Sequence, residues 1–314
     1  MIELTAARMS RDVCRLLLKN SKGRIHSVFD SAVNIQMCNG GLITVLAAGR
    51  CLCPRSVSLA ENVVFTSIGL KQDSCVSFSS HSIQLSNKAI INIKNAELIS
   101  LSIPKPSVPV VTGNGEYEAR MAVLASVLNE AENMAEGIAP VLCDMFGICA
   151  VEHNVWSGFL VGQIRSLYEI LRSRDVLACA VAGRSVAGCG PGLTPASDDF
   201  LVGVFASLYG ASTAGILPRK TAIRLCRGLS EGAIPATGII SAAFLGSGAR
   251  GYFSEDIVNL IFSFFCLKNS FSLGDKEKLT HFAGLVCSSG STSGVDTLAG
   301  IWFGLAACCP PGVK

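Results

Sequence analysis

Charged side chains are scarce in this sequence of 314 residues: 16% are Asp, Glu, Lys or Arg, and the formal net charge at pH 7 is +3. Lys and Arg are scattered rather than clustered, so we expect no nucleic-acid partner. No Ser-His-Asp pattern, GxSxG elbow, Walker loop or HExxH motif occurs, which excludes the usual signatures of serine hydrolases, P-loop nucleotide hydrolases and zinc peptidases. Hydrophobic residues make up 50% of the chain, which predicts a folded protein with enough apolar surface for two domains.

The N-terminus lacks the apolar core of a secretory signal, because acidic residues fall within its first twelve positions. We therefore expect a cytoplasmic protein whose 14 cysteines are reduced thiols. The pairs Cys51-x-Cys53 and Cys308-Cys309 lack the spacing of a zinc site. The longest uncharged run, residues 200–218, is rich in Gly, Ala and Ser, which is typical of a tightly packed buried helix and argues against the alternative of a membrane span.

Residues 22–103 carry the pattern of short β-strands. Two mainly apolar runs, 28–38 and 42–46, are separated by Asn39-Gly40-Gly41, a strong hairpin signal. In the segment 99–103, apolar residues alternate with serine in the period of a strand. Five to eight strands of this length predict a small β-barrel or sandwich.

A proline-rich segment, residues 104–109, predicts a linker, and we place the domain boundary there, with a β-rich domain at 1–108 and an all-α domain at 109–314. Beyond residue 116 the apolar period becomes helical. The fold class expected is α+β, a small β-barrel or sandwich followed by a larger all-α domain. Predicted helices cover residues 116–136, 155–173, 195–213, 219–230, 235–248, 254–268, 275–287 and 293–307.

The most informative motif is Gly188-Cys-Gly-Pro-Gly-Leu-Thr-Pro-Ala-Ser-Asp-Asp-Phe-Leu-Val-Gly203, a glycine-rich turn that leads into a helix. Gly190 and Gly192 permit a close approach of the backbone to a ligand. Thr194 is expected to be the N-cap, with proline at the first helical position. The free N–H groups of such a helix start favour an anion such as phosphate or carboxylate, so we predict that Gly190, Gly192 and Thr194 bind substrate.

Two adjacent carboxylates, Asp198 and Asp199, follow in the first turn of that helix. They repel an anion unless a Mg²⁺ ion, an Arg or Lys, or a substrate amide stands between. We therefore regard both as candidate catalytic residues and as candidate Mg²⁺ ligands, and expect no other cofactor. The alternative is that Asp198 completes a helix cap and Asp199 is solvated.

A second segment, Gly290-Ser-Thr-Ser-Gly-Val-Asp-Thr-Leu-Ala-Gly300, resembles the first. Both fit Gly-x-Thr, a short spacer, then Asp-x-Leu-x-Gly, and each opens an apolar helix. Ser293 is a candidate cap and substrate contact, and Asp296 is a third candidate catalytic carboxylate. Two helix N-termini of one design could face one ligand; the alternative is a shared local solution to helix capping.

Four further polar residues are candidates for substrate binding. Thr237 and Ser241 lie four residues apart, on the same face of a predicted helix, where hydroxyls either contact a ligand or bond to their own helix carbonyls. His26 and Asn34 are the candidates from the β-rich domain, and a local structural role is the alternative for both.

With the motif at 188–203, the Thr237/Ser241 segment and Ser-Gly-x-Asp-Thr-Leu-Ala-Gly at 293–300, the sequence resembles the AllH family. The β-rich start, with His26-Ser-Val-Phe and Ala32-Val-Asn34, fits as well, so the likeness covers nearly the whole chain. Ser197 stands where the family's motif leads us to expect Gly, and Val295 where an aromatic residue is common.

This resemblance implies a subunit of the oxamate carbamoyltransferase of anaerobic allantoin breakdown. Oxalurate and phosphate then give oxamate and carbamoyl phosphate, and two other kinds of subunit take part. A small anionic substrate and carbamoyltransferase subunits are the partners expected. The alternatives are a non-catalytic, anion-binding or scaffolding subunit of the complex, and a stand-alone carboxylate-handling enzyme of another pathway.

Overall fold

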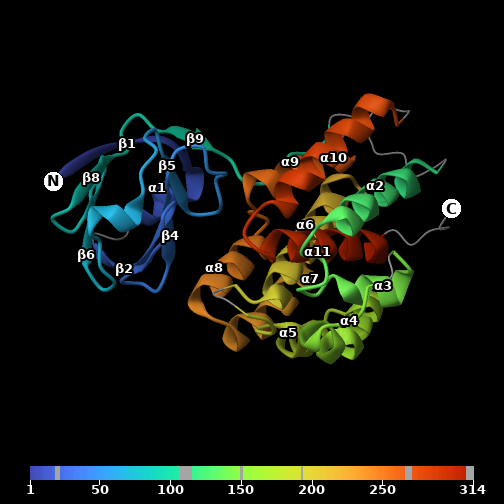
Figure 1. Ribbon diagram of the computed structural model, residues 1–314. Coiled ribbons are helices and arrows are strands. Elements are labelled where there is room, and N and C mark those ends of the chain that lie inside the picture. The colour runs from blue at the N-terminus through green and yellow to red at the C-terminus, as the bar shows by residue number, and fades with distance from the viewer. Residues whose placement is uncertain (18–21, 107–114, 149–150, 192–193, 266–270, 309–314) are drawn as a thin grey trace. The chain divides into compact units, whose positions relative to one another are not determined.

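The computed structural model describes residues 1–17, 22–106, 115–148, 151–191, 194–265 and 271–308 (Figure 1). The chain divides into two compact units, Met1–Leu101 and Ser102–Lys314, and each is described by itself. The predicted boundary between residues 108 and 109 lies outside the described residues and stays a prediction.

The first unit is a closed β-barrel. Its described strands are β1 (Ile2–Ser10), β2 (Lys22–Val28), β3 (Ala32–Met37), β4 (Leu42–Leu46), β5 (Ser56–Leu59), β6 (Cys75–Phe78), β7 (Ser82–Leu85), β8 (Ala89–Asn92) and β9 (Glu97–Ile99). They follow one another in the order β5-β4-β3-β2-β6-β7-β8-β1-β9. The ring closes because β1 pairs with β8 in parallel and also with β5 in antiparallel orientation.

The barrel interior is filled by the alternating apolar side chains of these strands. In β7, Ile83 and Leu85 are fully buried, whereas Gln84 between them is exposed. The same period places the buried residues of the other strands in one core. This unit confirms the predicted small β-barrel at the start of an α+β chain.

Two strand predictions are wrong in detail. The apolar run 28–38 is not one strand, because the chain reverses after β2 and Phe29 N donates a hydrogen bond to Ala32 O at 2.8 Å. The alternating segment 99–103 is mostly not a strand either: β9 ends at Ile99, and Ser102 forms an isolated bridge with Tyr252. Strand β1 and the short helix α1 (Arg11–Leu17) lie before the region in which strands were predicted.

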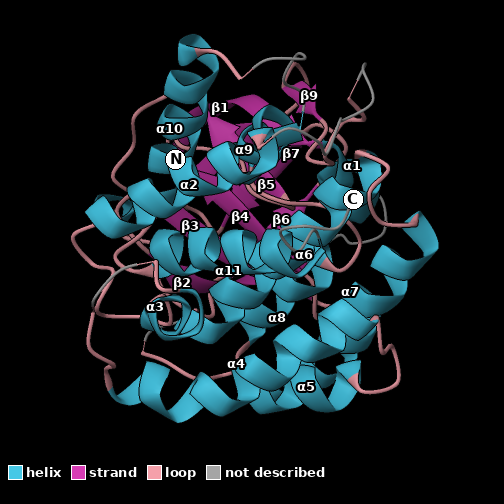
Figure 2. Ribbon diagram, turned by 90° about the vertical axis from the view of Figure 1, so that its right-hand side faces the viewer, coloured by secondary structure: helices cyan, strands magenta, loops and turns pink. Residues whose placement is uncertain are grey.

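The second unit is helical throughout its regular structure, as predicted (Figure 2). Its described α-helices are α2 (Glu116–Glu130), α3 (Pro140–Phe146), α4 (Val155–Ser173), α5 (Cys179–Val186), α6 (Ala196–Thr213), α7 (Arg219–Ala233), α8 (Ile239–Gly248), α9 (Glu255–Phe265), α10 (Leu273–Cys287) and α11 (Ser293–Cys308). A short 3₁₀ turn, η2 (Ile234–Ala236), precedes α8. The short helices α3 and α5 were not predicted.

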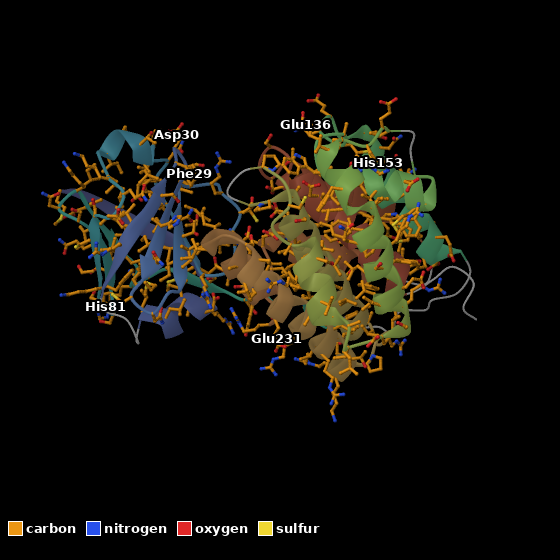
Figure 3. All side chains as sticks on the ribbon, turned by 90° about the horizontal axis from the view of Figure 1, so that it is seen from below. Phe29, Asp30, His81, Glu136, His153 and Glu231 are labelled. Atoms are coloured by element: carbon orange, nitrogen blue, oxygen red, sulfur yellow. The ribbon has the colours of Figure 1, made fainter. Side chains whose placement is uncertain are left out.

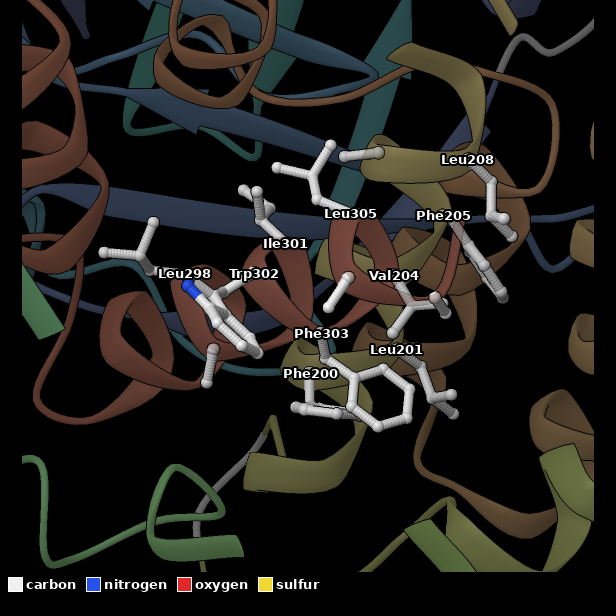
Figure 4. Packing of buried hydrophobic residues seen from close by; sticks show 14 of the residues in the cluster. Phe200, Leu201, Val204, Phe205, Leu208, Leu298, Ile301, Trp302, Phe303 and Leu305 are labelled. Atoms are coloured by element: carbon white, nitrogen blue, oxygen red, sulfur yellow. The ribbon is translucent and has the colours of Figure 1, made fainter. Parts of the chain in front are cut away.

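Helices α6 and α11 form the centre of the helical core. Every residue of α11 from Gly294 to Ala307 is buried. The ring centroids of Phe200 in α6 and Phe303 in α11 lie 5.1 Å apart, and both residues are labelled in Figure 4. Charged residues are therefore scarce in α6 and α11 because both helices are buried in the core. Among the described residues, no helix is both long enough and apolar enough to cross a membrane.

Among the described cysteines, one differs from the expectation of a reduced thiol. Cys143, in α3, is disulfide-bonded, so the prediction of reduced thiols throughout the chain is wrong. Cys179 and Cys226 are buried free thiols, and burial raises the pKa of both. Among the described residues, no cluster of three or more His, Cys, Asp or Glu could hold a metal ion.

Candidate functional site

The site is built on a close crossing of α6 and α11. A Cβ atom on Gly203 would overlap the main-chain oxygen of Thr297, and a Cβ on Gly300 would overlap that of Phe200. Phe200 lies three residues before Gly203, and Thr297 lies three residues before Gly300. The glycine of each helix therefore contacts the equivalent residue of the other helix. The repeated motif of the sequence is thus an approximate two-fold pair in the fold, and only glycine allows the two backbones to come this close.

The crossing brings the first turns of both helices together, because Asp199 and Asp296 each lie one turn before these glycines. Thr194 Oγ1 and Ser293 Oγ are 3.1 Å apart across the junction, within hydrogen-bonding distance. Both hydroxyls lower the pKa of the Asp199 carboxyl, and the charge of Asp296 raises it. The two helix starts therefore lie side by side, and that they face one ligand stays a prediction.

Asp199 is held in an environment that disfavours its charge. Burial is the main cause that raises its pKa well above the usual value, the neighbouring charges of Asp296 and Asp198 raise it further, and the hydroxyls of Ser293 and Thr194 lower it. Its Oδ2 atom is buried and forms no hydrogen bond with the described residues. Asp199 as a residue is half-buried.

Asp296 is more deeply placed, with 0% of its surface exposed. Its Oδ1 accepts a hydrogen bond of 2.6 Å from Ile138 N, and its carboxyl lies directly over Gly137, where a Cβ would be 2.5 Å from Asp296 Cγ. Burial raises its pKa to about 7, against the hydrogen bonds from the backbone of Ile138 and Ala139. Within the described part of the chain, Asp296 Oδ2 has no hydrogen-bond partner.

Asp198 has a different role, because both its oxygens are used inside the protein. Oδ1 accepts a hydrogen bond of 2.8 Å from Gly188 N, and Oδ2 accepts one from Thr237 Oγ1. Burial raises its pKa, and Thr237, Gly188 and Ser241 lower it. Ser241 Oγ is buried beside Asp198 but forms no hydrogen bond of good geometry with any described residue. Asp198 therefore ties the glycine-rich loop to the start of α8.

The start of α6 differs from the predicted cap. The helix begins at Ala196 with Pro195 as the N-cap residue, and no side chain caps it. Three first-turn N–H groups already have acceptors: Ser197 N donates to Cys189 O at 3.1 Å, and the N atoms of residues 198 and 199 donate to Pro195 O. Thr194 is freed to face Ser293 instead. The helix terminus therefore has fewer free N–H groups for an anion than the sequence predicted.

The glycine-rich loop is held against α6 by further hydrogen bonds. Cys189 N donates to Ser197 Oγ at 2.9 Å, so the residue that departs from the family's pattern supplies a contact of its own. Gly190 has a φ of 123°, and a Cβ there would lie 2.6 Å from Ala196 N, which requires glycine. Gly192, the other predicted substrate contact in this loop, lies outside the described residues.

Four further predicted contacts are placed as follows. Thr237 and Ser241 are not on one helix, because Thr237 follows η2 and α8 begins at Ile239, yet both lie beside Asp198. His26 and Asn34 belong to the barrel unit, in β2 and β3. Asn34 Nδ2 donates to Ser27 Oγ at 3.0 Å and Asn34 Oδ1 accepts from Thr44 Oγ1 at 2.8 Å. The ligand roles of His26 and Asn34 stay predictions.

A magnesium ion fits this arrangement only in part. Asp198, one of the two predicted ligands, has both oxygens engaged by Gly188 and Thr237. The oxygens left over are those of Asp199 and Asp296, and Mg²⁺ is commonly held by one or two carboxylates together with water and substrate oxygens. A Mg²⁺ ion held by Asp198 and Asp199 therefore stays a prediction.

Sequence reasoning missed the segment that covers Asp296. Asn154, the N-cap of α4, donates from Nδ2 to Ala135 O at 2.8 Å and to Gly137 O at 2.7 Å. Glu136 and His153, next to these contacts, lie on the same side of the helical unit in Figure 3. Asn154 thus fixes the turn that presents Ile138 N to Asp296. The local signal was present in the Asn154-x-x-Ser capping pattern, but its contact with residues 135–137 is not encoded locally.

Two models of one protein family match segments of this chain. The family model described as "Oxamate carbamoyltransferase subunit AllH" matches residues 186–305, and the AllH family N-terminal domain model matches residues 5–98. The first match spans the glycine-rich loop, α6, α8 and α11, and the second spans most of the barrel. No solved structure matches the chain. The family names support an oxamate carbamoyltransferase subunit, and this chain belongs to the AllH family.

Proposed function

We propose that this chain is a substrate-binding and catalytic subunit of an oxamate carbamoyltransferase, and that the junction of the α6 and α11 N-terminal turns is its active site. The reaction converts oxalurate and phosphate into oxamate and carbamoyl phosphate, and the chain acts together with other subunits. Its place in anaerobic allantoin breakdown and in the cytoplasm is part of the same proposal.

One observation carries the proposal: two buried carboxyl oxygens, on the first turns of α6 and α11, have no hydrogen-bond partner among the described residues. Asp199 Oδ2 and Asp296 Oδ2 come from two copies of one motif, and the glycines behind them hold the copies together. Buried polar atoms are nearly always paired in folded proteins, so such orphans point to a missing ligand. Groups whose pKa values are shifted by burial are also typical of active sites.

The chemistry needed is a transfer of the H₂N–CO group. An oxygen of phosphate forms a bond to the ureido carbonyl carbon of oxalurate, and the bond from that carbon to the oxamate nitrogen breaks. The leaving nitrogen takes up a proton, and the attacking phosphate loses one. A carboxyl with a pKa of about 7, such as Asp296, can hold or release a proton near neutral pH. Asp199, whose pKa burial raises well above its usual value, offers a second such group.

The first test is phosphorolysis of oxalurate by the purified chain, alone and mixed with its candidate partner subunits, with and without Mg²⁺, following carbamoyl phosphate. We expect product only in the mixture. If the chain is a scaffold, the mixture stays active when Asp199 and Asp296 are both replaced by Asn. No product from a mixture of folded and associated subunits contradicts the proposed reaction.

A further inference from the structure

The charges around the junction do not suit a bare anion. The charges that raise the pKa of Asp199 are those of Asp296 and Asp198, and no Lys or Arg of the described residues is among the main influences on these three carboxyls. Where these carboxyls are ionised, a phosphate or carboxylate placed between them would meet charge of its own sign in a buried setting, in which screening by solvent and salt is weak.

At the start of α6 the backbone offers an anion little compensation. The N–H groups of Ser197, Asp198 and Asp199 already donate to carbonyl oxygens, and Pro195, the N-cap residue, has no N–H group. The anion site that a helix terminus usually provides is therefore largely occupied by the protein itself at α6.

The two carboxyl oxygens without partners, Asp199 Oδ2 and Asp296 Oδ2, are hydrogen-bond acceptors when ionised. An ionised carboxylate accepts only, and a protonated carboxyl offers one donor and one acceptor. A ureido group, H₂N–CO–NH, presents N–H donors beside a carbonyl acceptor and so complements a carboxyl in either state. The hydroxyls of Thr194 and Ser293, half-buried at the same junction, can donate to or accept from such a group.

We infer that Asp199 and Asp296 bind the uncharged ureido end of the substrate through its N–H groups, and that the phosphate and the substrate carboxylate are neutralised by positive side chains of a partner subunit. This inference rests on the proposed function and deepens it. The chain supplies the part of the active site that holds the carbamoyl group, and the part that binds the anions is completed only in the complex.

Calorimetric titration of the full-length chain without partners tests this. The probes are acetylurea, which keeps the ureido end and has a methyl group in place of the carboxylate, and inorganic phosphate, both at millimolar concentration. We expect acetylurea to bind and phosphate not to bind. This comparison uses the wild-type chain, so it does not depend on how variants fold. Phosphate binding, or no acetylurea binding, overturns the inference.

Variants then locate the binding. Asp199→Asn and Asp296→Asn replace an acceptor by a donor and are expected to weaken acetylurea binding at least tenfold. Asp144→Asn, a surface change at a carboxyl of α3 that pairs with Arg165, is the matched control and is expected to change nothing. Unchanged binding in both site variants overturns the inference. Carbamoyl phosphate formation by the mixture together with phosphate binding by the chain alone would refute the inference and leave the proposed function standing.

Discussion

Replacing Gly300 by Ala is expected to destabilise the helical unit, although Gly→Ala within a helix is usually stabilising. The added Cβ would lie 2.7 Å from the carbonyl carbon of Phe200 and 3.0 Å from its Cα. Nonbonded carbon atoms rest about 3.5–4.0 Å apart, so α6 and α11 have to separate by roughly 1 Å. Overpacking costs about 1–3 kcal/mol, and because the obstructing atoms are main chain we expect the upper end, about 3 kcal/mol.

Gly162→Ala in α4 is the matched control, because Gly162 is exposed and a Cβ there has no atom within 4 Å. It is expected to stabilise the chain by about 0.5–1 kcal/mol through the lower helix propensity of glycine. Urea unfolding, followed by far-UV circular dichroism, gives the denaturation midpoint of each variant. The two midpoints compare stability directly when the dependence of the unfolding free energy on urea concentration is the same. A Gly300→Ala chain as stable as the Gly162→Ala chain would refute the close crossing on which the site depends.

Three further predictions concern the carboxyls. Gly137→Ala places a Cβ 2.5 Å from Asp296 Cγ and is expected to lower thermal stability by about 1–3 kcal/mol; a wild-type melting curve speaks against the contact. Thr237→Val removes a donor from buried Asp198 and is expected to cost about 1.5–3 kcal/mol in urea unfolding, whereas Ser241→Ala is expected to cost less than about 1 kcal/mol; the opposite order contradicts this. Because the pKa of Asp296 is raised from 3.8 to about 7 in the folded chain, its ionisation opposes folding, and stability falls as pH rises through that interval. The fall amounts to at most roughly 4 kcal/mol, and Asp296→Asn is expected to flatten it in urea midpoints measured from pH 4 to pH 8; an unchanged slope rejects the raised pKa.

The sequence was most informative where local signals agree. The predicted helix 155–173 has the bounds of α4, because Asn154 and Ser157 form a capping box directly before an amphipathic run. The short helices α3 and α5 were missed, since one has seven residues and the other eight, too few to establish a helical period. Strand β1 was also missed, because its pairing with β5 and β8 depends on residues 48 to 87 positions away.

At the site, the residue types were predictable and their partners were not. The repeated motif identified Asp199 and Asp296 as candidates. The hydrogen bond from Ile138 to Asp296 joins residues 158 positions apart, which no local pattern encodes. Thr194 was assigned to a cap on local grounds, but the approach of α11 gives its hydroxyl Ser293 as a neighbour instead.

The central claim is that Asp199 and Asp296 act together on the carbamoyl group, and one measurement tests it most directly. Carbamoyl phosphate formation from oxalurate and phosphate is followed in the assembled complex with the wild-type chain, with Asp199→Asn, with Asp296→Asn and with the surface control Asp144→Asn. We predict a loss of at least a hundredfold in kcat/KM for each site variant and wild-type turnover for the control. Full turnover by both site variants, in complexes that assemble normally, would contradict the account.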